Sequence, residues 1–371
     1  MQLGRRQQVT TMGAVVVATA LSLVACSSSS SSSSPSTGTS SSSGSGAASS
    51  SNAKLSGTLN ASGSTFQTTY QEAAIQAFKS VQSGMTVNYG NGGSGKGRTD
   101  LASGVTNFGG SDSPIPAAEL SNFKGKTVLY FPVFIGPITM SYNLPGLSKP
   151  LQLDPTVIAN IFQGKVTTWN NSAIAADNPG VTLPNTAITI AVRSDSSGTT
   201  QNFSLFLKDA VPSVWKLGSS STIKWPATAR AGSGNPGVAS IIKSTPGALG
   251  YVDYADAKAS GLIFASVKNK IGSYIAPTPT SASASAAGVT VAPDLTFHAV
   301  WGSGATAYPI TYQSWDLVYA TQPNANDAAM LKAYIGYLVG DGQKLLPSLG
   351  YAPLPANIDQ MAITQLSKIG S

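Results

Sequence analysis

The feature that most constrains the fold is the alternation of two residue patterns along the chain. From about Leu55 to the C-terminus, short β-rich runs such as residues 187–192 alternate with runs that have helical apolar spacing, such as residues 67–80. Strands that alternate with helices predict an α/β fold with a largely parallel sheet. The chain has 371 residues, which allows two such domains of ordinary size.

Several segments refine this prediction. The long apolar run of residues 128–144 is typical of buried strands, and residues 307–320 predict a further strand region. Residues 154–164 predict a helix that is capped by Asp154. Residues 276–288 are rich in Ala, Ser, Thr and Pro, and we expect them to form a low-complexity loop on the surface.

The N-terminus has the pattern of a lipoprotein signal peptide. Arg5 and Arg6 precede an uncharged apolar run, residues 12–25, which is too short to span a bilayer comfortably. The run ends in Leu-Val-Ala-Cys, a lipobox pattern in which Cys26, the only cysteine of the chain, becomes lipid-modified and forms the new N-terminus. The alternative is an ordinary secretory signal that happens to end beside a cysteine.

A tether is expected directly after the signal peptide. The signal peptide is assigned to residues 1–25 and the tether to residues 26–53, which after the cysteine are almost entirely Ser, Gly, Thr and Ala. Such a composition cannot form a packed core. We therefore expect an extracytoplasmic domain that is anchored to the cell membrane by a lipid at Cys26 and is a monomer.

The charge of the chain argues against nucleic acid as a partner. Only 10% of the residues are charged, and the formal net charge of +7 falls to +5 when the two arginines of the signal peptide are removed. There is no dense run of Lys and Arg, which nucleic-acid binding would require. A mildly basic protein of this kind suits a small anionic ligand at least as well.

Four turns share one composition, in which Gly, Ser and Thr lie between a strand end and a helix start. They are residues 61–66, 91–100, 109–116 and 193–200. In an open α/β sheet, ligands bind at the carboxyl ends of the strands, where helix N-termini offer free N–H groups. An ordinary helix cap explains any one of these turns equally well. Four such turns around one cleft would hold a tetrahedral oxyanion.

Three charged residues in these turns sharpen the hypothesis. Arg193 carries a planar guanidinium that suits an oxyanion, and Asp195 could orient it. Asp112 is informative because a carboxylate repels an anion unless the anion carries a proton to donate. Phosphate at neutral pH has such a proton and sulfate has none, so Asp112 would select phosphate.

With these motifs the sequence resembles a known family, the phosphate-binding proteins of the bacterial high-affinity phosphate ABC transporter. The resemblance covers nearly all of residues 57 to about 355. It rests chiefly on Gly-Ser-Thr-Phe at 63–66, on the long signature at 88–115 and on Arg-Ser-Asp-Ser-Ser-Gly-Thr-Thr-Gln-Asn-Phe at 193–203. The family is an extracytoplasmic receptor for inorganic phosphate, which it delivers to a membrane permease and its ATPase.

The resemblance also implies a fold and a division into lobes. The expected fold is the periplasmic-binding-protein type II fold, in which two α/β lobes are joined by hinge strands and close around a ligand. We expect the first lobe to comprise residues 54–133 and 307–371, and the second lobe residues 134–306. The family needs no cofactor or metal and catalyses no reaction, so we expect this chain not to be an enzyme.

Carried over residue by residue, the resemblance implies a set of phosphate ligands with Asp195 as the partner of Arg193. The implied ligands are Thr65, Phe66, Ser94, Asp112, Arg193, Ser197, Gly198 and Thr199, where Phe66 and Gly198 act through their backbone N–H groups. The chain departs from the usual family pattern at Gln67, where Pro is common, at Gly95, where a second Ser is common, and at Ser196, where Gly is common. These departures leave every ligand position in place.

Two other functions fit the sequence less well. A binding protein for another oxyanion, such as molybdate or sulfate, conflicts with Asp112. A secreted phosphatase-like enzyme would need a metal cluster or an activated nucleophile. The chain has one histidine, His298, which is distant in sequence from the Ser-rich turns, and it has no metal-binding motif.

Overall fold

The computed structural model describes residues 54–147 and 149–371. The predicted signal peptide, Cys26 and nearly all of the tether lie outside the described residues. All described residues belong to one compact unit. Within this part of the chain, no helix has both the length and the apolar character needed to cross a bilayer.

Three parallel strands form the first group of the sheet. They lie in the order β2 (Met85–Asn91), β1 (Gly57–Gly63) and β3 (Phe108–Ser111). β11 (Thr311–Tyr319) pairs antiparallel with β3 at the edge of this group. Because Gly63 is in register with Asn91 on one side and with Gly110 on the other, the three parallel strands end together. The turns that follow them are therefore neighbours.

A second parallel group consists of β8 (Ala248–Asp253), β6 (Thr189–Arg193) and β7 (Arg230–Gly232). A smaller set of strands adjoins it. β9 (Ile263–Lys268) pairs antiparallel with β10 (Tyr274–Ile275) and parallel with β5 (Gln152–Leu153).

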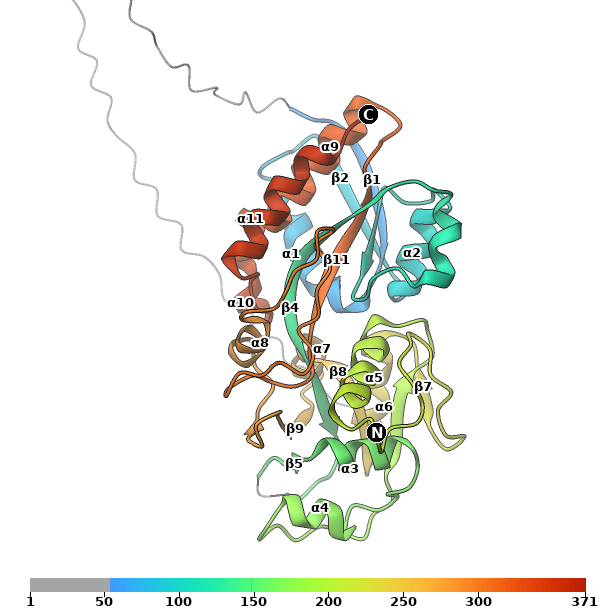
Figure 1. The fold of residues 1–371 in the computed structure, drawn as a ribbon, viewed down its shortest axis with the longest axis vertical. Coiled ribbons are helices and arrows are strands. Elements are labelled where there is room, and N and C mark those ends of the chain that lie inside the picture. The colour runs from blue at the N-terminus through green and yellow to red at the C-terminus, as the bar shows by residue number, and fades with distance from the viewer. Residues whose placement is uncertain (1–53, 148) are drawn as a thin grey trace, which may run out of the picture. The chain divides into compact units, whose positions relative to one another are not determined.

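The long strand β4 (Val128–Tyr142) belongs to both groups. Its first part pairs antiparallel with β11, and its last five residues, Ile138–Tyr142, pair antiparallel with β8. Figure 1 shows β4 in green, running from the first group of strands into the second. The chain returns beside it, where the Ile138 N–H donates to the Ile310 carbonyl at 2.8 Å. β4 and the segment before β11 are thus the crossing strands of a two-lobed α/β protein.

The sheet is mixed, whereas the sequence predicted a largely parallel one. Both lobes have a parallel set of strands, as expected from the alternation of strands and helices. β4 and β11, however, run antiparallel to all of their neighbours. The alternation predicts parallel neighbours within each lobe but carries no information on strands that cross between lobes.

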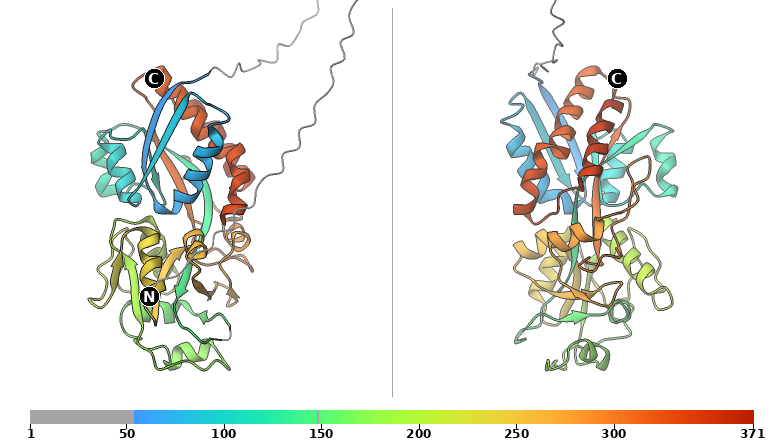
Figure 2. Two further views of the ribbon diagram at one scale, coloured as in Figure 1. Left: turned by 180° about the vertical axis from the view of Figure 1, so that it is seen from behind. Right: turned by 60° about the vertical axis from the view of Figure 1, so that its left-hand side comes forward.

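Helices cover both groups of strands. Those of the first lobe are α1 (Thr68–Phe78), α2 (Ser94–Ala102), α9 (Ala325–Val339), α10 (Leu346–Leu349) and α11 (Ala356–Gln365), and α9 and α11 lie side by side in Figure 2. Those of the second lobe are α3 (Pro155–Phe162), α4 (Ser172–Asp177), α5 (Gly198–Ala210), α6 (Gly234–Ser244) and α7 (Tyr254–Ala259). The predicted cap of α3 is confirmed, because Asp154 accepts a hydrogen bond from the Thr156 N–H at 2.7 Å.

The prediction of a surface loop at residues 276–288 is wrong. Most of this segment forms the helix α8 (Pro279–Ala286), which begins with a capping box between Thr278 and Ser281. Ala282 and Ala286 are buried in one apolar cluster with Trp315 of β11. The low complexity of the segment hid a helix whose small residues allow close packing.

The same apolar cluster bears on the division into lobes. Phe297 lies in it beside Trp315 and Leu317, so part of the range 134–306 packs against β11. The precise residues at which one lobe gives way to the other stay a prediction.

Candidate functional site

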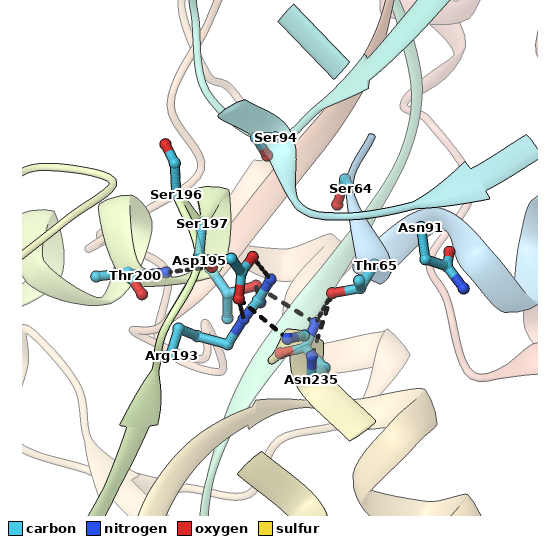
Figure 3. A network of polar contacts seen from close by, with 12 residues as sticks. Ser64, Thr65, Asn91, Ser94, Arg193, Asp195, Ser196, Ser197, Thr200 and Asn235 are labelled. Carbon is cyan, nitrogen blue, oxygen red and sulfur yellow. Dashed lines mark hydrogen bonds and ion pairs between the residues drawn. The ribbon is translucent and has the colours of Figure 1, made fainter. Parts of the chain in front are cut away.

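Five turns between a strand and a helix meet where the two lobes face each other. Four of them are the turns singled out in the sequence, which follow β1, β2, β3 and β6. The fifth leads from β7 into α6. Figure 3 shows polar side chains from four of these turns pointing toward one another, among them Thr65, Ser94, Arg193 and Asn235. They form a polar cluster between the lobes.

Asp112 is the buried carboxylate of this cluster, with a side chain that is 1% exposed. Its Oδ1 accepts a hydrogen bond from the Ser314 hydroxyl at 2.6 Å, and its Oδ2 accepts one from the Ser64 hydroxyl at 2.6 Å. The Ser94 hydroxyl lies 3.4 Å from Oδ2 and accepts from the Asp112 N–H at 3.1 Å. Burial raises the pKa of Asp112 from 3.8 to about 6, although these hydroxyls and Arg193 act in the opposite direction.

The hydroxyls around Asp112 are oriented by further donors. Ser314 Oγ accepts a hydrogen bond from Gln67 Nε2 at 2.9 Å, and Ser64 Oγ accepts one from the Phe66 N–H at 3.1 Å. A hydroxyl that already accepts from an N–H group has its own hydrogen free to donate. The surrounding groups therefore favour the ionised form of Asp112 as a hydrogen-bond acceptor. In this form it can accept a hydrogen bond from a protonated oxygen of a ligand.

Arg193 is the buried cation of the cluster and is 5% exposed. Its Nε and Nη2 donate to the two carboxylate oxygens of Asp195 at 2.8 and 2.5 Å. The Gly234 N–H adds a third hydrogen bond to Asp195 at 3.0 Å. Burial by itself would raise the pKa of Asp195, but the hydrogen bonds and charge of Arg193 outweigh it and hold that pKa below its ordinary value. The predicted pairing of Asp195 with Arg193 is present.

The start of α5 lies against Asp112. Ser197 caps the helix, with its hydroxyl accepting from the Thr200 N–H at 3.1 Å. A Cβ atom added to Gly198 would lie 2.4 Å from Ser94 Oγ and 2.6 Å from the Cβ of Asp112, so only glycine permits this approach. The free N–H groups at the beginning of α5 are thereby placed next to the carboxylate and to Arg193.

Direct hydrogen bonds hold the two lobes together around the cluster. The Gly95 N–H donates to the Ser196 carbonyl at 3.0 Å, and Asn202 Nδ2 donates to the Asp112 carbonyl at 2.7 Å. The Asn235 N–H donates to Thr65 Oγ1 at 3.2 Å. Each bond joins a residue of α2, of the turn after β3 or of the turn after β1 to a residue of the second lobe. The structure is therefore a closed arrangement of the lobes.

The structure brings the predicted site residues into this one region. Most of them already have partners within the protein. The Phe66 N–H, for example, donates to Ser64, and the Ser197 hydroxyl accepts from Thr200. His298 is not among them, since it lies exposed in the loop before β11. No group of His, Cys, Asp and Glu side chains in the described ranges is arranged to hold a metal ion.

Sequence reasoning missed four residues of the cluster. Ser64 stands next to the predicted ligand Thr65 in a segment that carries the resemblance, whereas Asn235 lies outside the four turns singled out in the sequence. Asn202 lies one turn into α5, and its amide reaches back to Asp112. Ser314 stands inside the strand β11, more than 200 positions from Asp112 in the sequence. No turn motif marks Ser314, and only the pairing of β11 with β3 brings it to the carboxylate.

Comparisons with known proteins show the family to which this chain belongs. The family model of the PBP superfamily domain matches residues 41–342. The phosphate-binding protein PstS 3 of Mycobacterium leprae is 33% identical over 84% of this chain and 87% of its own length. The phosphate-binding protein PstS of Xylella fastidiosa is 35% identical over 74% of this chain and 76% of its own length. The chain belongs to the PstS family of phosphate-binding proteins.

Solved structures of similar proteins support the fold. The high affinity periplasmic phosphate-binding protein PfluDING, solved with bound phosphate, matches with a TM-score of 0.67 at 20% identity, over 85% of this chain and 99% of that one. A phosphate ABC transporter substrate-binding protein from Clostridium perfringens matches with a TM-score of 0.59 at 15% identity, over 81% and 100% of the two chains. This member of the PstS family thus has the predicted periplasmic-binding-protein type II fold.

Proposed function

We propose that this chain binds inorganic phosphate outside the cytoplasm and delivers it to the permease of an ABC transporter. The observation that carries the proposal is the pairing of one buried carboxylate, Asp112, with one buried guanidinium, Arg193, inside a cluster of hydrogen-bond donors. The cation and donors suit an oxyanion, and the carboxylate suits only an oxyanion that still carries a proton. Phosphate meets both conditions at neutral pH.

The proposed ligands are those that the resemblance implied. Arg193 supplies the positive charge, and the hydroxyls of Thr65, Ser94, Ser197 and Thr199 supply hydrogen-bond donors. The backbone N–H groups of Phe66 and Gly198 add two more donors. Asp112 accepts a hydrogen bond from the protonated oxygen of the ligand. The Phe66 N–H and the Ser197 hydroxyl would exchange their present partners, Ser64 and Thr200, for phosphate or share them. The closeness of Gly198 to Ser94 and Asp112 supports this set.

We further propose that the protein carries out no covalent chemistry. Among the described side chains, no metal-binding group accompanies the cluster. The hydroxyls of Ser64 and Ser314 donate to Asp112 and that of Ser197 caps α5, and among the described residues no hydroxyl of the cluster has a histidine as its partner. Release would follow from reopening of the lobes at the permease and its ATPase.

The attachment to the membrane is proposed from the sequence. Cleavage before Cys26 and its lipidation, including palmitate, would leave a lipoprotein on the outer face of the cell membrane. Residues 26–53 would act as the tether, and the folded part would work as a monomer.

Titration calorimetry on the secreted chain tests the ligand. The protein carries Cys26→Ser to prevent lipidation, and bound anion is removed by unfolding and refolding. We expect a Kd for phosphate of about 1 µM or tighter and no measurable heat with sulfate. Failure of the refolded, ligand-free protein to bind phosphate, or equal affinity for sulfate, would contradict the proposal.

A further inference from the structure

Asn235 occupies a place in the cluster that no sequence signal assigned. It is the second residue of α6, its side chain is fully buried, and it faces Thr65 across the gap between the lobes. Gly234 makes the approach possible, because its φ of +67° belongs to the left-handed region and a Cβ there would lie 3.0 Å from Thr65 Cγ2. The start of α6 is therefore built to touch Thr65.

Asn235 is the donor in each of its hydrogen bonds to the two threonines. Its backbone N–H and its Nδ2 donate to Thr65 Oγ1 at 3.2 and 3.3 Å. The same Nδ2 lies 3.4 Å from Thr199 Oγ1, which also accepts from Arg193 Nη1 at 3.2 Å. Asn235 Oδ1, by contrast, is buried without a partner among the described residues. The side chain acts on the site through its NH₂ group.

These contacts decide what the two threonine hydroxyls can still do. A hydroxyl has two acceptor lone pairs and one hydrogen. Both lone pairs of Thr65 Oγ1 are used by Asn235, and those of Thr199 Oγ1 are used by Asn235 and Arg193. Each hydroxyl then has only its hydrogen left, and it can meet a ligand only as a donor.

We infer that Asn235 is a positioning residue, which makes Thr199 an obligatory donor within the second lobe and makes Thr65 one when the lobes close. The inference rests on the proposed function and adds a link between closure and specificity. In an open arrangement the Thr65 hydroxyl could accept or donate. In the closed one it donates, so the proton of a ligand finds its acceptor at Asp112. Asn235 thus helps fix which oxygen of the ligand carries the proton.

Replacing Asn235 by Asp gives a direct test, because an ionised carboxylate accepts and cannot donate. Thr65 and Thr199 would then turn their hydrogens toward the new carboxylate and away from phosphate. A protonated carboxyl has one O–H to donate, so acid should partly restore binding. Asn235→Ala removes the NH₂ group without adding charge, and Asn91→Asp adds the same charge at an exposed position near the cluster.

The affinity for phosphate is measured at about pH 8 and at about pH 5. At each pH, the affinity of a variant is divided by the affinity of the unmodified protein. This ratio removes the titration that all the variants share, including that of Asp112 and Asp195. We expect a loss of about tenfold for Asn235→Ala at both pH values. For Asn235→Asp we expect a loss above about a hundredfold at the higher pH that shrinks at the lower pH. Asn91→Asp should change the affinity by less than about threefold.

The outcomes separate this inference from the proposed function. If the unmodified protein does not bind phosphate, the proposed function fails. If it binds and the loss for Asn235→Asp equals that for Asn235→Ala at both pH values, only the role of Asn235 is overturned. Circular dichroism and thermal unfolding confirm that each variant is folded.

A double-mutant cycle covers the case in which Asn235→Asp does not fold. If Asn235 acts in part through Thr65, combining Asn235→Ala with Thr65→Val should cost less than the sum of the two single losses. Thr65→Ser keeps the hydroxyl and should retain most of the affinity. Additive losses in the cycle would mean that Asn235 acts independently of Thr65, which would overturn the inference.

Discussion

Replacing Asp112 by Asn is the most informative single change in the site. The shape of the side chain is kept, but one carboxylate oxygen becomes an NH₂ group and the negative charge is lost. Ser64 and Ser314, which now donate to the two oxygens, can rotate and accept from the new amide. The change therefore tests the chemistry of position 112 with little change in packing.

The effect on binding follows from one hydrogen bond. A hydrogen bond that involves a charged group contributes about 1.5 to 3 kcal/mol, and about 1.4 kcal/mol corresponds to a factor of ten. Phosphate would lose the acceptor for its proton, so its affinity should fall by about tenfold to a hundredfold. Sulfate would no longer face a carboxylate and would gain a donor. The ratio of phosphate to sulfate affinity should fall by about a hundredfold or more.

The same change should stabilise the ligand-free protein. Burial raises the pKa of Asp112 from 3.8 to about 6, so between these values the folded state binds more protons than the unfolded state. Stability therefore falls as the pH rises through this window, and above it the ionised group costs about 3 kcal/mol. Asp112→Asn should remove this cost at neutral pH. The advantage should disappear as the pH falls toward 4.

Calorimetric titration with both anions and thermal unfolding of the ligand-free protein measure the two effects. Asp316→Asn is the matched control, because burial also raises the pKa of Asp316, to about 7, and its carboxylate accepts from Gln71 Nε2 at 3.1 Å. It should raise the Tm near neutral pH and leave the ratio of the two affinities unchanged. If Asp112→Asn keeps the preference for phosphate, Asp112 is not the proton acceptor and the reasoning is refuted.

Three further changes test other parts of the account. Gly198→Ala places a methyl group 2.4 Å from Ser94 Oγ, and titration calorimetry should show a loss of phosphate affinity of about a hundredfold; normal affinity would mean that the lobes need not approach this closely. Asp195→Asn leaves the buried Arg193 without its ionic partner, so the free energy of unfolding should fall by about 2 kcal/mol without ligand and recover in phosphate. Ala282→Asp puts a charge into the apolar cluster under α8 and should cost about 3 kcal/mol in chemical denaturation, whereas a surface loop would tolerate it.

Much of the fold could be predicted because local patterns decide it. The strand before Arg193 and the helix after Ser197 follow from β-rich alternation and from a hydroxyl cap. The capped helix at Asp154 follows in the same way. The antiparallel course of β4 and β11 could not be predicted, because it depends on how the chain crosses between lobes. α8 was hidden because Ala and Ser give no apolar periodicity, although both fit a closely packed helix.

The site likewise contains residues that the sequence predicts and residues that only the tertiary structure brings together. Arg193, Asp195 and Asp112 could be found because charges are rare in this chain and stand beside glycine-rich turns. Ser314 could not be found, since it lies within a strand and meets Asp112 only through tertiary pairing. Asn235 looked like an ordinary residue at a helix start. The role inferred for it rests on its two hydrogen bonds to Thr65, which only the folded structure brings together.

A crystal structure of the protein with phosphate tests the central claim most directly. We expect phosphate inside the cluster, with Arg193 donating to it and with one phosphate oxygen about 2.5 to 2.7 Å from a carboxylate oxygen of Asp112, as in a charge-assisted O–H···O bond. Phosphate bound elsewhere would contradict the account. So would phosphate in the cluster with no oxygen within hydrogen-bonding distance of Asp112.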